Sequence, residues 1–123
     1  MINLALVVLA LTLIGPQAPD AGAAVNTRTS NGYSVAMHAA AGGQHAVLRL
    51  LHARGADLDA QTDSGLSALI LAAWTGDRAT ARVLIDLGAR LDLKYRGRDS
   101  ARAIAAARGH HDVAALIASA GGR

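Results

Sequence analysis

The chain has 123 residues, which is long enough for one small domain and too short for two. It has no cysteine, so a disulfide scaffold, a cysteine-based zinc site and a cysteine nucleophile are all excluded. The formal net charge of +3 is too small to indicate nucleic-acid binding by itself. Alanine and leucine dominate the apolar residues, and their helix propensity and close packing favour an all-α fold.

An almost uninterrupted apolar stretch covers residues 2–14. A helix of this length rises about 20 Å, which is short of the ~30 Å hydrocarbon core of a bilayer, and Gly15 and Pro16 end it. Ala21 and Ala23 place small residues where a signal peptidase reads the chain. We therefore predict an N-terminal hydrophobic helix, a signal peptide over residues 1–23, and a periplasmic or secreted mature protein.

Two alternatives for this stretch stay open, because no Lys or Arg precedes it. It could be an uncleaved anchor in the inner membrane, or a helix buried in the domain. A composition rich in Ala and Arg, with a single Lys, suits a GC-rich bacterial genome and favours the periplasm.

From residue 22 onward the sequence repeats with a period of 33. Glycine, serine and apolar residues all recur in the same register. The series are Gly22, Gly55, Gly88 and Gly121; Gly43, Gly76 and Gly109; Ser34, Ser67 and Ser100; Val25, Leu58 and Leu91; Leu50, Val83 and Leu116. A period of this length is typical of a solenoid, in which stacked helix pairs share one continuous core.

Each repeat predicts a first helix, a short turn, a second helix and an extended finger. The serine of each unit precedes the first helix, where its hydroxyl can accept orphan backbone N–H groups. The glycines of the second series are expected to end that helix with a positive φ. Gly55 and Gly88 are expected to end the second helices.

The segments Gly65-Leu-Ser-Ala-Leu-Ile-Leu-Ala-Ala-Trp-Thr-Gly-Asp and Val83-Leu-Ile-Asp-Leu-Gly-Ala resemble the ankyrin repeat. The resemblance implies a domain over residues 24–123 with three helix-turn-helix units, at 29–61, 62–94 and 95–123. Two departures stand out. The family's Thr-Pro-Leu-His tetrapeptide is degraded, and in the third unit Gly97 comes one residue early, with Arg98 in the expected glycine position. We therefore expect a distorted third finger.

The five histidines do not predict a metal site. His110, His111 and Asp112 form the densest cluster, but adjacent helical side chains point about 100° apart, which is poor geometry for one ion. We expect His38 to be packed or hydrogen-bonded. The serines are interpreted as caps and no nucleophile stands beside a base, so we expect no enzyme activity, no metal and no cofactor.

In ankyrin proteins, partners are usually bound by the finger tips and the concave helix face. The resemblance therefore implies a non-catalytic protein-protein interaction module that is a monomer or bound to its partner. Carried over position by position, the expected partner-binding residues are Asn31, Tyr33, Asp63, Ser64, Leu66, Trp74, Thr75, Tyr95, Arg96 and Arg108. Tyrosine and tryptophan are typical binding hot spots, because they bury large rigid areas.

Basic residues concentrate towards the C-terminus, at Arg90, Lys94, Arg96, Arg98, Arg102 and Arg108. Such a charge gradient would steer an acidic patch on a protein partner. Polyanion or nucleic-acid binding through this cluster is a distant alternative, and we do not expect it because aromatic residues do not interleave with the basic ones. Membrane contact is expected only if residues 2–14 are retained.

Overall fold

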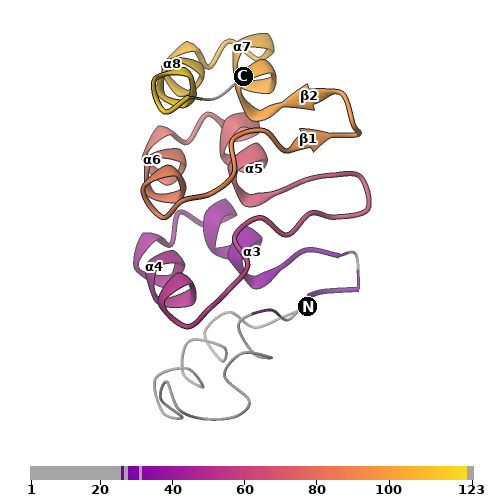
Figure 1. Cartoon of the computed structure of the whole chain (residues 1–123), viewed down its shortest axis with the longest axis vertical. Coiled ribbons are helices and arrows are strands. Elements are labelled where there is room, and N and C mark those ends of the chain that lie inside the picture. The colour runs from indigo at the N-terminus through magenta and orange to yellow at the C-terminus, as the bar shows by residue number, and fades with distance from the viewer. Residues whose placement is uncertain (1–25, 27, 31, 122–123) are drawn as a thin grey trace.

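The computed structural model describes residues 26, 28–30 and 32–121. Their helices form three pairs, and Figure 1 shows the pairs stacked one above another. The pairs are α3 (Val35–Ala41) with α4 (His45–Ala53), α5 (Ala68–Thr75) with α6 (Arg78–Asp86), and α7 (Ala101–Ala107) with α8 (His111–Ser119). The all-α repeat fold is thereby confirmed, whereas the expected N-terminal hydrophobic helix lies outside the described residues.

The three serines occupy equivalent places in successive layers. The Oγ atoms of Ser34, Ser67 and Ser100 each accept a hydrogen bond from the backbone N–H three residues later, at 3.1, 3.3 and 3.3 Å. All three residues are buried. A cap of this kind contributes about 1 kcal/mol, because it satisfies a donor that the helix itself cannot. The predicted role of the serines is confirmed.

The turn between the helices of each unit depends on glycine. Gly43, Gly76 and Gly109 have φ values of +65°, +78° and +82°, in the left-handed region that other residues enter at a cost. At Gly76 space is also restricted, since an added Cβ would lie 2.5 Å from Nδ1 of His110. The second helices end just before Gly55 and Gly88, as the sequence predicts.

The core runs through all three units in two layers. Ala39, Ala72 and Ala105 are equivalent and no more than 2% exposed, and their small side chains let α3, α5 and α7 approach closely. In the other layer Leu51, Leu84 and Ile117 hold equivalent positions and are fully buried. Since each unit supplies only part of this core, the units stabilise one another.

The fingers extend from the α3–α5–α7 layer (Figure 1). In the first two fingers the turn closes on a glycine, with Gly32 N donating to Thr29 O at 2.9 Å and Gly65 N donating to Thr62 O at 2.8 Å. The third finger is an antiparallel pair of β1 (Lys94–Tyr95) and β2 (Asp99–Ser100).

The turn of the third finger differs from the other two. Its closing bond runs from Arg98 N to Tyr95 O at 3.1 Å, and both Arg96 and Gly97 have positive φ values, of +53° and +68°. The early glycine therefore does distort this finger.

Side chains at the bases of the fingers link each unit to the next. Oδ1 of Asn26 accepts from Asp57 N at 2.9 Å, and Oδ1 of Asp59, at the equivalent position, accepts from Arg90 N at 2.8 Å. Within the residues that the structure describes, none of the helices combines the length and apolarity needed to cross a bilayer.

Candidate functional site

A hollow lined mainly by aromatic and leucine side chains lies between α5 and the three fingers. We call it the aromatic hollow, and its lining residues are Tyr33, Leu66, Leu71, Trp74 and Tyr95. Its volume is about 240 Å³. Among the described residues Trp74 is the exposed large hydrophobic side chain, at 38% exposure. Tryptophan is among the residues most enriched at binding hot spots, and here it adjoins other apolar side chains in a hollow.

Two rings of the hollow contact each other. The ring centroids of Trp74 and Tyr95 are 5.7 Å apart at an interplanar angle of 76°, which is the edge-to-face geometry that aromatic pairs prefer. Trp74 belongs to unit two and Tyr95 begins unit three, so this contact joins two neighbouring units across the hollow. The position of Trp74 is thus set before any partner arrives.

Arg108 holds Trp74 in two ways. Its guanidinium carbon lies 4.5 Å from the centroid of the Trp74 ring, and its Nε donates to the Trp74 carbonyl oxygen at 3.0 Å. His110 Nε2 lies 3.2 Å from the same oxygen. Because a carbonyl oxygen only accepts, that imidazole nitrogen carries the proton. The third unit therefore fixes both the ring and the backbone of this residue.

Arg96 makes a similar set of contacts at the tip of the third finger. Its Nε donates to the Tyr95 hydroxyl at 3.0 Å, and its guanidinium carbon lies 5.3 Å from the centroid of that ring. Its backbone N–H donates to Ser64 O at 2.7 Å. Its φ of +53° is strained for a residue with a Cβ, by about 1–2 kcal/mol. These contacts hold the strained residue in place.

Six of the ten expected partner-binding residues lie at the aromatic hollow. Tyr33, Leu66, Trp74 and Tyr95 line the aromatic hollow, while Arg96 and Arg108 flank it. Ser64 supplies the carbonyl that accepts from Arg96, and Asp63 is exposed at the second finger. Thr75 turns its hydroxyl back onto its own helix, donating to Leu71 O at 3.1 Å. Asn31 lies outside the described residues.

Leu71 is a lining residue that the sequence analysis did not include. It stands three residues before Trp74 on α5, and this spacing places both side chains on one helix face. The same spacing would have identified it from the sequence once Trp74 was chosen as an anchor.

A second hollow lies on the α7 side of Trp74, with a volume of about 220 Å³. Its lining residues are Trp74, Asp99, Ala103, Ile104, Ala107 and Arg108. Ala107 holds the position in unit three that Trp74 holds in unit two, and Ala41 holds it in unit one. Because Ala107 is small, space is left beside the large Trp74 ring on the α7 side.

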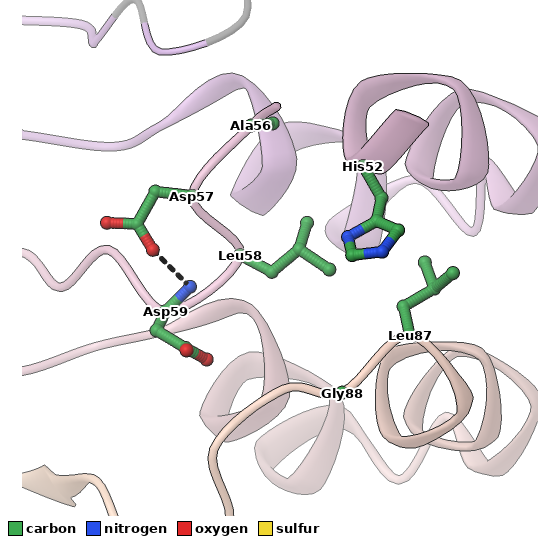
Figure 2. A pocket seen from close by; sticks show the side chains of 7 residues that line it. All are labelled: His52, Ala56, Asp57, Leu58, Asp59, Leu87 and Gly88. Carbon is green, nitrogen blue, oxygen red and sulfur yellow. Dashed lines mark hydrogen bonds between the residues drawn. The ribbon is translucent and has the colours of Figure 1, made fainter. Parts of the chain in front are cut away.

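A third hollow, of about 160 Å³, lies where α4 and α6 end (Figure 2). Its His52 ring points towards Leu58 and Leu87. The two carboxylates of this hollow accept hydrogen bonds from backbone N–H groups: Asp57 Oδ1 accepts from Asp59 N at 2.9 Å, and Asp59 Oδ1 accepts from Arg90 N. Throughout the described part of the chain there is no group of three side chains that could hold a metal ion.

A buried hydroxyl links units one and two on the side of the second helices. Thr80, fully buried, donates to Asp77 Oδ2 at 2.6 Å and lies 3.0 Å from His45 Nε2. Since the hydroxyl proton is given to the carboxylate, His45 must donate to Thr80 Oγ1. Burial acts to raise the pKa of Asp77, but the bonds from Thr80 and the nearby His45 outweigh it, so the pKa lies below 3.8.

His38 is packed, as the sequence indicates. Its ring lies 5.9 Å from that of Tyr33, and its Nε2 is buried without a hydrogen-bond partner among the described residues.

The fold and the comparison with known families agree. A family model for ankyrin repeats, in three copies, matches residues 7–95, which is more than half of the chain. No curated protein matches the chain significantly. The match starts within the expected signal peptide and ends before α7, yet α7 and α8 continue the same stack with the same serine cap and turn glycine. The chain therefore belongs to the ankyrin-repeat family.

Proposed function

We propose that this protein binds a protein partner, without catalysis, through the aromatic hollow and the adjoining finger tips. The observation that carries the proposal is Trp74, whose ring is exposed although Tyr95 and Arg108 hold it from the next unit. A side chain that is ordered before binding loses less conformational entropy when the partner arrives. Ankyrin repeats are also generally protein-protein interaction modules, and the family is generally non-catalytic.

For location, we propose a periplasmic or secreted mature protein, with residues 1–23 as a signal peptide. The sequence features that support this are the length of the apolar stretch and the small residues Ala21 and Ala23. The alternative is a membrane-anchored scaffold that retains residues 2–14. N-terminal sequencing after cell fractionation separates the two, because an intact Met1 in the membrane fraction supports the anchor.

The function is tested by crosslinking and recovery of bound proteins from a periplasmic extract. Baits are the wild type, Trp74→Ala, Arg96→Ala and the control Arg82→Ala, which removes an exposed pair with Asp86 on α6. We expect Trp74→Ala to lose a specific partner that the wild type and Arg82→Ala retain. Equal recovery of every protein by all four baits contradicts the proposed surface.

A further inference from the structure

We propose that the aromatic hollow and its two flanking arginines recognise an acidic segment of polypeptide that carries one aliphatic side chain. The aliphatic side chain enters the hollow, and carboxylates beside it pair with Arg96 and Arg108. This inference rests on the proposed function and adds the chemistry of the ligand to it.

The hollow suits an apolar side chain. All five lining residues present rings or leucine side chains. A volume of about 240 Å³ is below the ~300 Å³ at which sites for drug-sized ligands begin, so it fits part of a peptide and not a cofactor. Burying one aliphatic side chain there is favourable, because apolar surface of both the side chain and the hollow is removed from water.

A cationic ligand does not suit it. Aromatic hollows can hold quaternary ammonium groups, but only where the ring faces are open to the cation. Here guanidinium carbons already lie 4.5 Å from the Trp74 centroid and 5.3 Å from the Tyr95 centroid. A further positive charge would be repelled by both arginines.

The arginines are positioned to bind carboxylates. Each uses its Nε within the protein, and no hydrogen bond from its terminal nitrogens is present among the described residues. Arg96 and Arg108 form no ion pair within the described part of the chain, unlike Arg82 and Arg90. A guanidinium already held by a ring and a hydrogen bond loses little freedom when it pairs with a carboxylate.

Single-stranded nucleic acid also carries negative charge, but the rings do not form a platform for it. Successive bases stack on roughly parallel, open ring faces. The rings of Trp74 and Tyr95 are inclined at 76° to each other, and a guanidinium lies over each. The geometry therefore favours a peptide over a strand of bases.

The test uses the fluorescence of Trp74, which is the single tryptophan of the chain. The full chain is titrated with the blocked peptide Gly-Asp-Asp-Leu-Asp-Asp-Gly, with a second peptide in which serine replaces leucine, with a third in which lysine replaces each aspartate, and with an oligothymidylate. We expect a saturable change in emission with the first peptide, and at least tenfold weaker binding of the others.

Three variants connect the binding to the arginines. Arg96→Gln and Arg108→Gln should each raise the Kd of the acidic peptide about tenfold, because each removes a charge-assisted contact. Arg82→Gln should leave it unchanged. Arg96→Gln is the sharper test, since the hydrogen bond and ring contact of the Arg96 side chain are with Tyr95 and not with Trp74. Thermal unfolding of both variants checks that the stack is intact.

The outcomes separate this inference from the proposed function. Equal binding of the serine or lysine peptide overturns the inference, and so does tighter binding of the oligothymidylate. A Kd above the millimolar range for the acidic peptide also overturns it. If the peptides fail while Trp74→Ala still loses a partner in the crosslinking experiment, the proposed function stands and only the ligand chemistry is wrong.

Discussion

Arg108 contacts both the ring and the backbone of Trp74: its guanidinium carbon lies 4.5 Å from the ring centroid, and its Nε donates to the carbonyl oxygen at 3.0 Å. The two residues are 34 positions apart and belong to neighbouring units. A single side chain therefore couples the last turn of α5 to the end of α7, at the edge of the aromatic hollow. Stability of the third unit and the order of the hollow are linked through this contact.

Replacing Arg108 with alanine tests that link. We expect a loss of about 1 kcal/mol in the free energy of unfolding, together with a red shift of Trp74 emission, because the ring loses the side chain that covers it. Urea unfolding followed by circular dichroism gives the first quantity and steady-state fluorescence the second. Arg102→Ala is the matched control, since Arg102 is an exposed arginine on α7, the helix that Arg108 follows. Equal shifts in both variants would argue against the contact.

Replacing Ser67 with alanine removes the cap of α5. We expect a loss of about 1 kcal/mol, because the Ile70 N–H is then left without its partner in a buried place. Ser30→Ala, at the exposed turn of the first finger, should change the melting temperature little. The repeat register would be in doubt if the two substitutions were equally harmful.

Gly76 and Gly88 form a matched pair for backbone strain. Both have a strongly positive φ, of +78° and +88°, but an added Cβ meets the His110 ring at the first and nothing within 4 Å at the second. We expect Gly88→Ala to cost about 1 kcal/mol from the backbone alone, and Gly76→Ala to cost clearly more. Calorimetric melting of the two variants measures the difference. If the costs are equal, the close approach of His110 to Gly76 has no energetic effect.

Asp77 gives the stability a defined pH dependence. Its pKa is lowered on folding, so its charge stabilises the native state above the unfolded value of 3.8, and this contribution is lost as pH falls through the folded pKa. Asp77→Asn, which keeps an oxygen to cap α6, should be less stable than the wild type at pH 7. The difference should shrink below pH 3.8.

Urea midpoints at pH 7, 5 and 3 measure this difference. A gap between wild type and Asp77→Asn that widens on acidification would reverse the assigned sign. Asp77→Ala removes the cap as well, and we expect a further loss of about 1 kcal/mol at every pH.

The repeat register could be predicted from the sequence, because it depends on positions that recur every 33 residues, whereas four of the five lining residues of the hollow are expected from the resemblance to the ankyrin repeat. A serine cap or a turn glycine needs only its local neighbours to act, so its pattern is visible in the chain. The contacts of Arg108 and Arg96 could not be predicted in this way. These contacts depend on the conformations that long side chains adopt across the boundary between two units, and no local sequence pattern encodes those conformations.

The third finger shows both sides of this limit. Its early glycine predicts a distortion, because the turn can no longer close as in the first two fingers. The sequence does not say which residue takes up the strain. The structure assigns it to Arg96, which is held by Tyr95 and Ser64.

The carboxylate of Asp59 and the amide of Asn26 perform the same task one unit apart, each accepting a backbone N–H of the following unit. Asp92 occupies the next position of that series. Its carboxylate pairs with Arg90, so a duplicated block of residues 62–94, inserted after residue 94, would have to compete with that pair at its junction, and it would bring a second tryptophan with it. A single gene duplication would in this way lengthen the stack by one unit and double the number of tryptophans on it.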